Sequence, residues 1–161
     1  MRFVLFDRIL ELKKGQELVL LKNVSQSEDF FTDHFPDYPV VPGSIILGSF
    51  EQGAEILLAV TYDFAFRPVL EKISRASFRR FTVPGDQLEI RLSLRPGSPT
   101  RVQAVARVQD RRVADALLDF SLVKADGDPK VLEACARLKN LYGLFTSNPL
   151  AKAWDLWSSR S

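Results

Sequence analysis

The sequence predicts an α+β fold in which an antiparallel sheet wraps around one long buried helix. Two patterns carry this prediction: an apolar stretch of helical length over residues 44–60, and alternating apolar residues in the segments that follow it. One long helix after a strand pair, followed by an antiparallel meander, is typical of α+β domains. A chain of 161 residues with 46% in the hydrophobic class can bury one sizeable core, so we expect a single folded unit around it.

The first elements follow from turn chemistry and proline positions. Apolar residues over 3–12 and 18–24 flank a polar Lys-Lys-Gly-Gln turn and predict an opening strand pair. Residues 29–43 contain three prolines, which remove backbone donors, so no regular element is expected there. The helix over 44–60 follows, and Ser44 is its predicted cap. Apolar residues occur nearly all around this helix, which predicts that it lies inside the fold.

The rest of the chain reads as strands and a terminal helix. Strands are predicted over four segments separated by turn residues, namely 70–81, 87–95, 101–109 and 113–123. In 87–95 the apolar residues alternate with charged and polar ones, the period of a sheet with one wet face. From Pro129 an apolar stripe recurs at helical spacing. We therefore expect a domain over residues 1–125 and a C-terminal helical extension over 126–161 that packs on the domain or on a dimer.

Composition narrows the classes of partner. The 22 basic and 20 acidic residues nearly cancel to +2, so the overall field does not favour a nucleic acid. Cys135 has no second cysteine to pair with, and the opening residues do not form an apolar signal core, so we expect a reducing, cytoplasmic setting. The helix over 44–60 approaches membrane-span length but carries Glu51 and Glu55, which favours a buried helix over a membrane span.

One motif carries the chemistry. The only histidine, His34, lies in the proline-rich segment, within the ordered series Phe30-Phe31, His34-Phe35-Pro36, Pro39-Val40-Val41-Pro42-Gly43 and Gln52. This series resembles the signature of the FabZ-type 3-hydroxyacyl-acyl-carrier-protein dehydratases, and the resemblance extends over roughly residues 3–125. It implies a hotdog fold and a dimer with both active sites at the subunit interface. It also implies substrate contacts at four residues: Phe31, Phe35, Pro42 and Ile45.

The resemblance assigns roles to two residues. His34 corresponds to the histidine that abstracts the α-proton of a 3-hydroxyacyl thioester, and an imidazole with an ordinary pKa near 6.5 accepts a proton at cytoplasmic pH. The backbone N–H of Gly43 corresponds to the donor that stabilises the enolate, at a helix start where the dipole favours negative charge. As a simple turn glycine after proline, Gly43 would also satisfy the local backbone.

The family's acidic residue is missing. It falls fourteen residues after the histidine, which in this chain is Gly48. Loss of a general acid typically removes about 10²- to 10⁴-fold of rate, so the departure bears on activity rather than on fold. Glu51 and Glu55 lie one and two turns along nearly the same helix face, and Glu51 is the predicted replacement acid. The alternative is that both glutamates reach solvent or pair with arginines.

A basic stretch offers a docking surface. Four basic residues cluster here: Lys72, Arg75, Arg79 and Arg80. Such a run is often only a solvated strand face, but carrier proteins are acidic, so we expect the acyl carrier protein or a related thioester carrier to dock there. The sequence offers neither a Cys/His cluster for a metal nor a glycine-rich phosphate loop, and predicts no cofactor.

The predicted function is therefore that of a lyase. It would dehydrate 3-hydroxyacyl thioesters on acyl carrier protein to trans-2-enoyl thioesters in fatty-acid or related biosynthesis, as a homodimer or higher homo-oligomer. One alternative is a non-catalytic or partner-dependent acyl-binding subunit, such as a heterodimer with a catalytic homologue, and Gly48 favours it. A second alternative is an acyl thioesterase, against which Gly48 counts as well.

Overall fold

The computed structural model describes residues 4–32 and 38–146 of the chain. Its six-stranded antiparallel sheet has the order β1-β2-β4-β5-β6-β3, so β1 and β3 form the two edges. The strands are β1 (Arg8–Lys13), β2 (Glu17–Asn23), β3 (Phe66–Phe78), β4 (Gln87–Arg95), β5 (Ser98–Val108) and β6 (Arg111–Lys124). The helices are the 3₁₀ turn η1 (Asp29–Phe31), α1 (Gly43–Thr61) and α2 (Pro129–Thr146).

Helix α1 is the centre of the core. The sheet curves around it, and Phe50, Leu57 and Leu58 are completely buried. Its length and composition would suit a membrane span, but 61% of its apolar window is buried within the fold, as expected for the core helix of a domain. The predicted wrapping of a sheet around one helix is confirmed.

The sheet meets α1 at a close approach through a glycine. On β4, Leu88, Ile90 and Leu92 face the helix and are fully buried, as the period-2 pattern predicts. A Cβ added at Gly53 would come within 2.5 Å of Leu92 Cδ1 and 2.7 Å of Leu20 Cδ1. Only glycine allows the helix backbone to lie this close to the strands.

Three local predictions need correction. Strand β3 begins at Phe66, four residues earlier than predicted, because Pro68 is tolerated in an edge strand, where a missing N–H does not break the ladder. Residues Asp29–Phe31 form a 3₁₀ turn, since the first proline comes only after it. The N-cap of α1 is Pro42 rather than Ser44, and no side chain caps this end.

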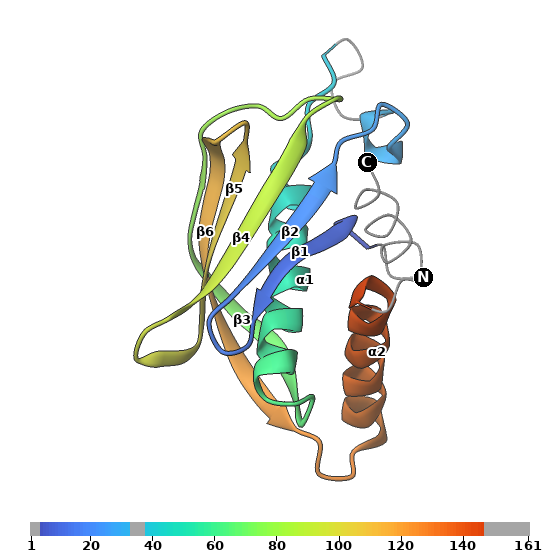
Figure 1. Ribbon diagram of the computed structural model, residues 1–161, viewed down its shortest axis with the longest axis vertical. Helices are drawn as coiled ribbons and strands as arrows, with labels where there is room; N and C mark the ends of the chain where they lie inside the picture. Colours follow the sequence, from blue (N-terminus) through green and yellow to red (C-terminus); the bar gives the residue numbers. More distant parts are fainter. Residues whose placement is uncertain (1–3, 33–37, 147–161) are drawn as a thin grey trace, which may run out of the picture.

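Helix α2 packs against α1 and against both edge strands. It therefore covers the side of α1 that the sheet leaves open, as Figure 1 shows. Leu138 joins the core, and the Phe145 ring packs on Phe6 with 4.6 Å between ring centroids. The predicted C-terminal helix is confirmed over 129–146, and the remainder of the predicted extension lies outside the described residues.

Candidate active site

The backbone N–H groups in the first turn of α1 have no capping side chain. Gly43 begins the helix directly after the N-cap Pro42, and no side-chain oxygen caps the turn. The first N–H groups of a helix lack intrahelical acceptors and form the positive end of its dipole. An anion or an enolate oxygen is therefore the natural complement of this turn.

An aromatic ring lies directly on this turn. A Cβ at Gly43 would sit 3.0 Å from Cε1 and Cζ of Phe78, so the ring packs against the glycine backbone. Phe78 is 50% exposed, and beyond it Phe81 meets Tyr38 edge to face at 6.4 Å. Exposed aromatic clusters of this kind mark binding surfaces. Sequence reasoning missed Phe78 as a wall of the site, because only the fold brings the end of β3 to the start of α1.

The predicted substrate residues fall into three groups. Pro42 and Ile45 flank Gly43, and Ile45 is half-buried against the core. Phe31 is buried within the core and packs on Phe30, with 4.6 Å between ring centroids. His34 and Phe35 lie outside the described residues.

A buried hydroxyl lies just behind the first turn. The carbonyl of Thr82 accepts a hydrogen bond from the N–H of Val41 at 2.8 Å. The Thr82 side chain is 1% exposed, and its Oγ1 has no hydrogen-bond partner among the described residues. A buried hydroxyl without a hydrogen bond is unfavourable for folding.

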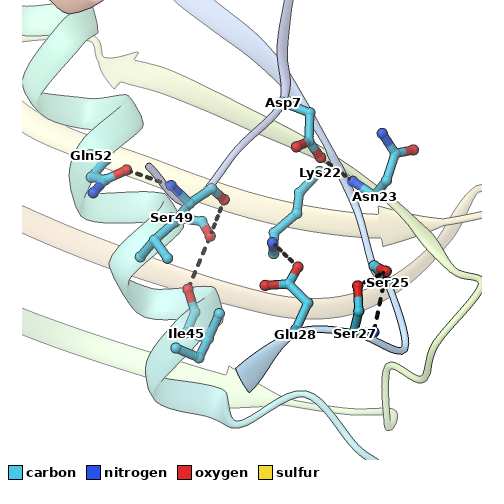
Figure 2. Close-up of polar contacts among 10 residues, drawn as sticks. Asp7, Lys22, Asn23, Ser25, Ser27, Glu28, Ile45, Ser49 and Gln52 are labelled. Atoms are coloured by element: carbon cyan, nitrogen blue, oxygen red, sulfur yellow. Dashed lines mark hydrogen bonds and ion pairs between the residues drawn. The ribbon is translucent and has the colours of Figure 1, made fainter. Parts of the chain in front are cut away.

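At Gly48, the position where the resemblance places an acid, α1 is covered by the chain's own N-terminal segment. A Cβ at Gly48 would come within 2.6 Å of Leu5 Cδ1. The Leu5 N–H donates to Gln52 Oε1 at 2.9 Å, and the Ser49 hydroxyl lies 2.9 Å from the carbonyl oxygens of both Leu5 and Ile45 (Figure 2). Two polar side chains of α1 therefore hold the backbone of residue 5 over Gly48.

The two glutamates face a different space. Glu51 and Glu55 line a cavity of about 360 Å³ between α1, β3 and α2, together with Arg67 and Arg137. Glu55 is buried, whereas Glu51 is partly exposed. Eight residues of helix separate Glu51 from Gly43, which is about 12 Å along the axis. Within one chain the structure therefore does not bring Glu51 to the first turn.

A thiol lies in the same region. Cys135 on α2 is buried, and this burial raises the pKa of the thiol, with Arg67 opposing the effect. A thiol held in its neutral form is a poor nucleophile at neutral pH. The described residues also contain no cluster of three or more His, Cys, Asp or Glu that could hold a metal ion.

The four predicted docking residues lie at the exposed edge strand and just beyond it. Arg75 and Arg79 both reach the carboxyl of Asp115 on β6. Lys72 and Arg80 are exposed. Two of the four basic side chains are therefore ion-paired with Asp115, and all four are exposed at the surface.

A model of the FabA-like domain matches residues 1–117. The chain belongs to the FabA-like family. This FabA-like chain is 39% identical over 123 residues to the 3-hydroxyacyl-acyl-carrier-protein dehydratase FabZ of Pelotomaculum thermopropionicum, covering 74% of the chain and 88% of the relative. It is 40% identical over 124 residues to FabZ of Desulforamulus reducens, covering 74% and 87%.

Solved structures confirm the hotdog fold. A hot-dog-like protein from Thermanaerovibrio acidaminovorans matches the FabA-like chain with a TM-score of 0.59 at 18% identity, covering 71% of this chain and 86% of that one. The dehydratase heterocomplex ApeI:P from Xenorhabdus doucetiae gives a TM-score of 0.57 at 15% identity, covering 70% and 95%. Helix α2 begins beyond the residues that the family model matches.

Proposed function

We propose that this chain dehydrates 3-hydroxyacyl thioesters on an acyl carrier protein to trans-2-enoyl thioesters, in fatty-acid or related biosynthesis in the cytoplasm. The observation that carries this proposal is the similarity to FabZ dehydratases, at 39% identity over 74% of the chain. The open first turn of α1, with an uncapped backbone and an aromatic wall, supports it.

The reaction follows from the proposed residue roles. His34 takes the α-proton of the substrate, and the C–H electron pair moves onto the thioester carbonyl to form an enolate. The N–H of Gly43 donates to the enolate oxygen at the positive end of α1. The enolate then collapses to the carbon–carbon double bond while the β-hydroxyl takes up a proton and leaves as water. The proposed source of that proton is Glu51 of the second subunit of the dimer, because within one chain Glu51 lies about 12 Å along α1 from Gly43.

The proposed enzyme is at least a dimer. Among the described elements, the 13-residue strand β3 pairs on one side only, with β6, and its other edge is unpaired. A long unpaired edge is a template for a second chain. Sedimentation at micromolar concentration is expected to show at least a dimer. A species of 18.2 kDa alone would contradict this.

A second function is favoured by one observation. Leu5 fills the space over Gly48, so the position that the resemblance gives to an acid holds a packed apolar side chain. The chain then acts as the subunit that supplies His34 and Gly43, while a homologous partner in a heterodimer supplies the carboxyl. In this form the isolated chain binds acyl thioesters but turns them over only with its partner.

One assay separates these functions. The purified chain is incubated with 3-hydroxyacyl and with saturated acyl thioesters, and both enoyl product and free thiol are measured. The proposed dehydratase gives enoyl product without free thiol. The partner-dependent form gives enoyl product only after an acid-bearing homologue is added. Release of free thiol from both substrates would indicate a thioesterase and contradict both proposals.

A further inference from the structure

Asp115 is a buried carboxylate on the outer face of the sheet. Its neighbours along β6, Ala114 and Ala116, face the core, so the alternation of the strand directs Asp115 to the opposite face. Despite that position it is only 2% exposed. A carboxylate on an outer face becomes this buried only when other side chains lie over it, and it then needs charged partners.

The register of β3 on β6 supplies those partners. Ser77 lies directly opposite Asp115, so Arg75 and Arg79, two residues to either side of Ser77, point to the same face. Arg79 Nε and Nη2 lie 3.0 and 2.9 Å from Asp115 Oδ2. Arg75 Nη2 lies 3.5 Å from Oδ1. The backbone N–H of Arg79 also donates to the carbonyl of Val113 at 2.8 Å, which fixes the base of its side chain.

Both arginines remain available to a partner. Their side chains are 66% and 51% exposed for Arg75 and Arg79. A guanidinium has five N–H donors, and Arg79 uses two of its five on Asp115. Two positive charges share one buried negative charge, so the group stays basic. Side chains that are already ordered lose less entropy when they bind.

We propose that Asp115 is a positioning residue that holds Arg75 and Arg79 ready for the acidic surface of an acyl carrier protein. This inference rests on the proposed function. The two arginines lie on either side of Phe78 in the chain, and the Phe78 ring lies against Gly43. A carrier bound at the arginines therefore lies on the outer face of the edge strand, and its pantetheine arm passes around that edge to bring the acyl cargo to the first turn of α1 on the other face.

Simple charge counting makes the opposite prediction. Removal of an acidic group from a basic surface raises the local positive potential and strengthens binding of an acidic partner. If Asp115 instead positions the arginines, Asp115→Asn frees both side chains and weakens binding. Whether Asp115→Asn strengthens or weakens carrier binding therefore decides between charge counting and positioning.

The test compares carrier-bound and carrier-free substrate. For the full chain, kcat/KM is measured with a 3-hydroxyacyl chain on acyl carrier protein and with the same chain on free pantetheine. In Asp115→Asn the ratio of the two values is expected to fall about tenfold, through KM for the carrier substrate. Arg79→Lys keeps the positive charge but loses the planar guanidinium that contacts Asp115 through two nitrogens. The ratio is expected to fall by the same factor in this variant. Asp115→Glu, which keeps the charge, should restore part of the ratio.

Asp119→Asn is the matched control. Asp119 lies four residues further along the same face of β6, and hydrogen bonds from Arg101 and Ser74 lower its pKa. Its substitution removes the same charge without freeing Arg75 or Arg79, so the ratio is expected to stay level or to rise. Thermal unfolding of each variant identifies any that fails to fold, and Arg79→Lys then carries the test.

Each other outcome has a definite meaning. A ratio that is unchanged or raised in Asp115→Asn and in Arg79→Lys would overturn the inference and leave the dehydratase in place. Turnover of the pantetheine substrate with no preference for the carrier would overturn the docking surface, and the inference with it, and would leave the dehydratase in place. Absence of turnover on both substrates, with and without an acid-bearing homologue, would remove the proposed function and the inference together.

Discussion

The first turn of α1 and its middle differ in what lies over the helix. At Gly43 no side chain caps the backbone, and the side chain nearest to a Cβ there is the half-exposed Phe78 ring. Five residues later, Gly48 lies beneath Leu5, whose backbone is held by hydrogen bonds to Ser49 and Gln52. One region can admit a substrate, whereas the other is filled by the chain itself.

This difference separates backbone chemistry from side-chain chemistry. A backbone N–H donor at the start of α1 persists as long as the helix begins at Gly43, whatever side chains surround it. A carboxyl donor instead depends on the residue at one position, and at Gly48 there is no side chain and Leu5 lies over the backbone. The helix therefore retains the part of the proposed site that needs only its backbone.

The largest expected effect concerns the proposed base, which is to act together with the backbone donor at Gly43. Where dehydration is detected, alone or with a partner, His34→Ala is expected to lower it by at least 10²-fold, the typical loss for a general base. Circular dichroism checks that the variant is folded. Unchanged turnover in a folded variant would remove His34 from the mechanism and leave the first turn without a base.

The second prediction concerns the middle of the helix. Gly48→Glu is expected to raise dehydration by restoring a carboxyl, and the gain should be larger when Leu5→Ala is added, because the new Cβ would otherwise lie 2.6 Å from Leu5 Cδ1. A gain of about tenfold to 10²-fold is expected for the double variant. Leu5→Ala alone is the control and should not raise the rate.

If Gly48→Glu does not raise dehydration, two explanations are possible, and Glu51→Gln separates them. If Glu51 already supplies the proton, Glu51→Gln abolishes the activity of the parent chain and Gly48→Glu adds little. If Glu51→Gln leaves the parent unchanged and the double variant shows no gain on several chain lengths, the middle of α1 serves another purpose. Stability is measured alongside, because a carboxyl buried beneath residue 5 is unfavourable unless it is paired.

The sequence predicted most of the secondary-structure elements that contain these two regions. The period-2 alternation located β4 at both ends, and helical length located α1 within one residue at each end. The family motif also predicted Gly43 as a backbone donor and Gly48 as the position without the family's acid, and both assignments stay predictions. These features are local in sequence, so periodicity and spacing are sufficient to find them.

The contacts that distinguish the two regions were not predictable in this way. Leu5 meets Gly48, and Phe78 meets Gly43, only because the fold brings distant segments together. In the sequence, Asp115 is indistinguishable from an ordinary polar residue on a solvent-facing side of a strand. Only the strand register, which pairs it with Ser77, shows that Arg75 and Arg79 lie beside it. Such contacts depend on tertiary register, which a single sequence does not encode in any local pattern.

The third prediction tests how the N-terminal segment is held. Phe145 packs on Phe6, next to Leu5, whereas Leu144 is 70% exposed. Phe145→Ala is expected to cost about 2 kcal/mol of unfolding free energy, and Leu144→Ala less than about 0.5 kcal/mol. Amide exchange at Leu5 should accelerate only in the former. Equal effects of the two variants would contradict a role for α2 in holding this segment.

Deletion of residues 129–161 extends the same test. The chain is expected to lose stability but to keep the core fold, because the matched family domain ends before α2. Far-ultraviolet circular dichroism measures the sheet. Complete loss of its β signal would show that α2 is required for the core.

The smallest expected effect concerns the support of the first turn. Thr82 is 1% exposed, its Oγ1 has no partner among the described residues, and its carbonyl holds Val41 close to the start of α1. Thr82→Val keeps the shape and removes the unsatisfied hydroxyl, so it is expected to stabilise the chain by about 1 kcal/mol. In a chain of this size that gain raises Tm by about 2 to 4 °C. Thr82→Ser, which keeps the hydroxyl and loses the methyl, is the control and should lower Tm. Destabilisation by Thr82→Val would mean that the hydroxyl is hydrogen-bonded in solution, and would make Thr82 a polar support of the first turn rather than a packing residue behind it.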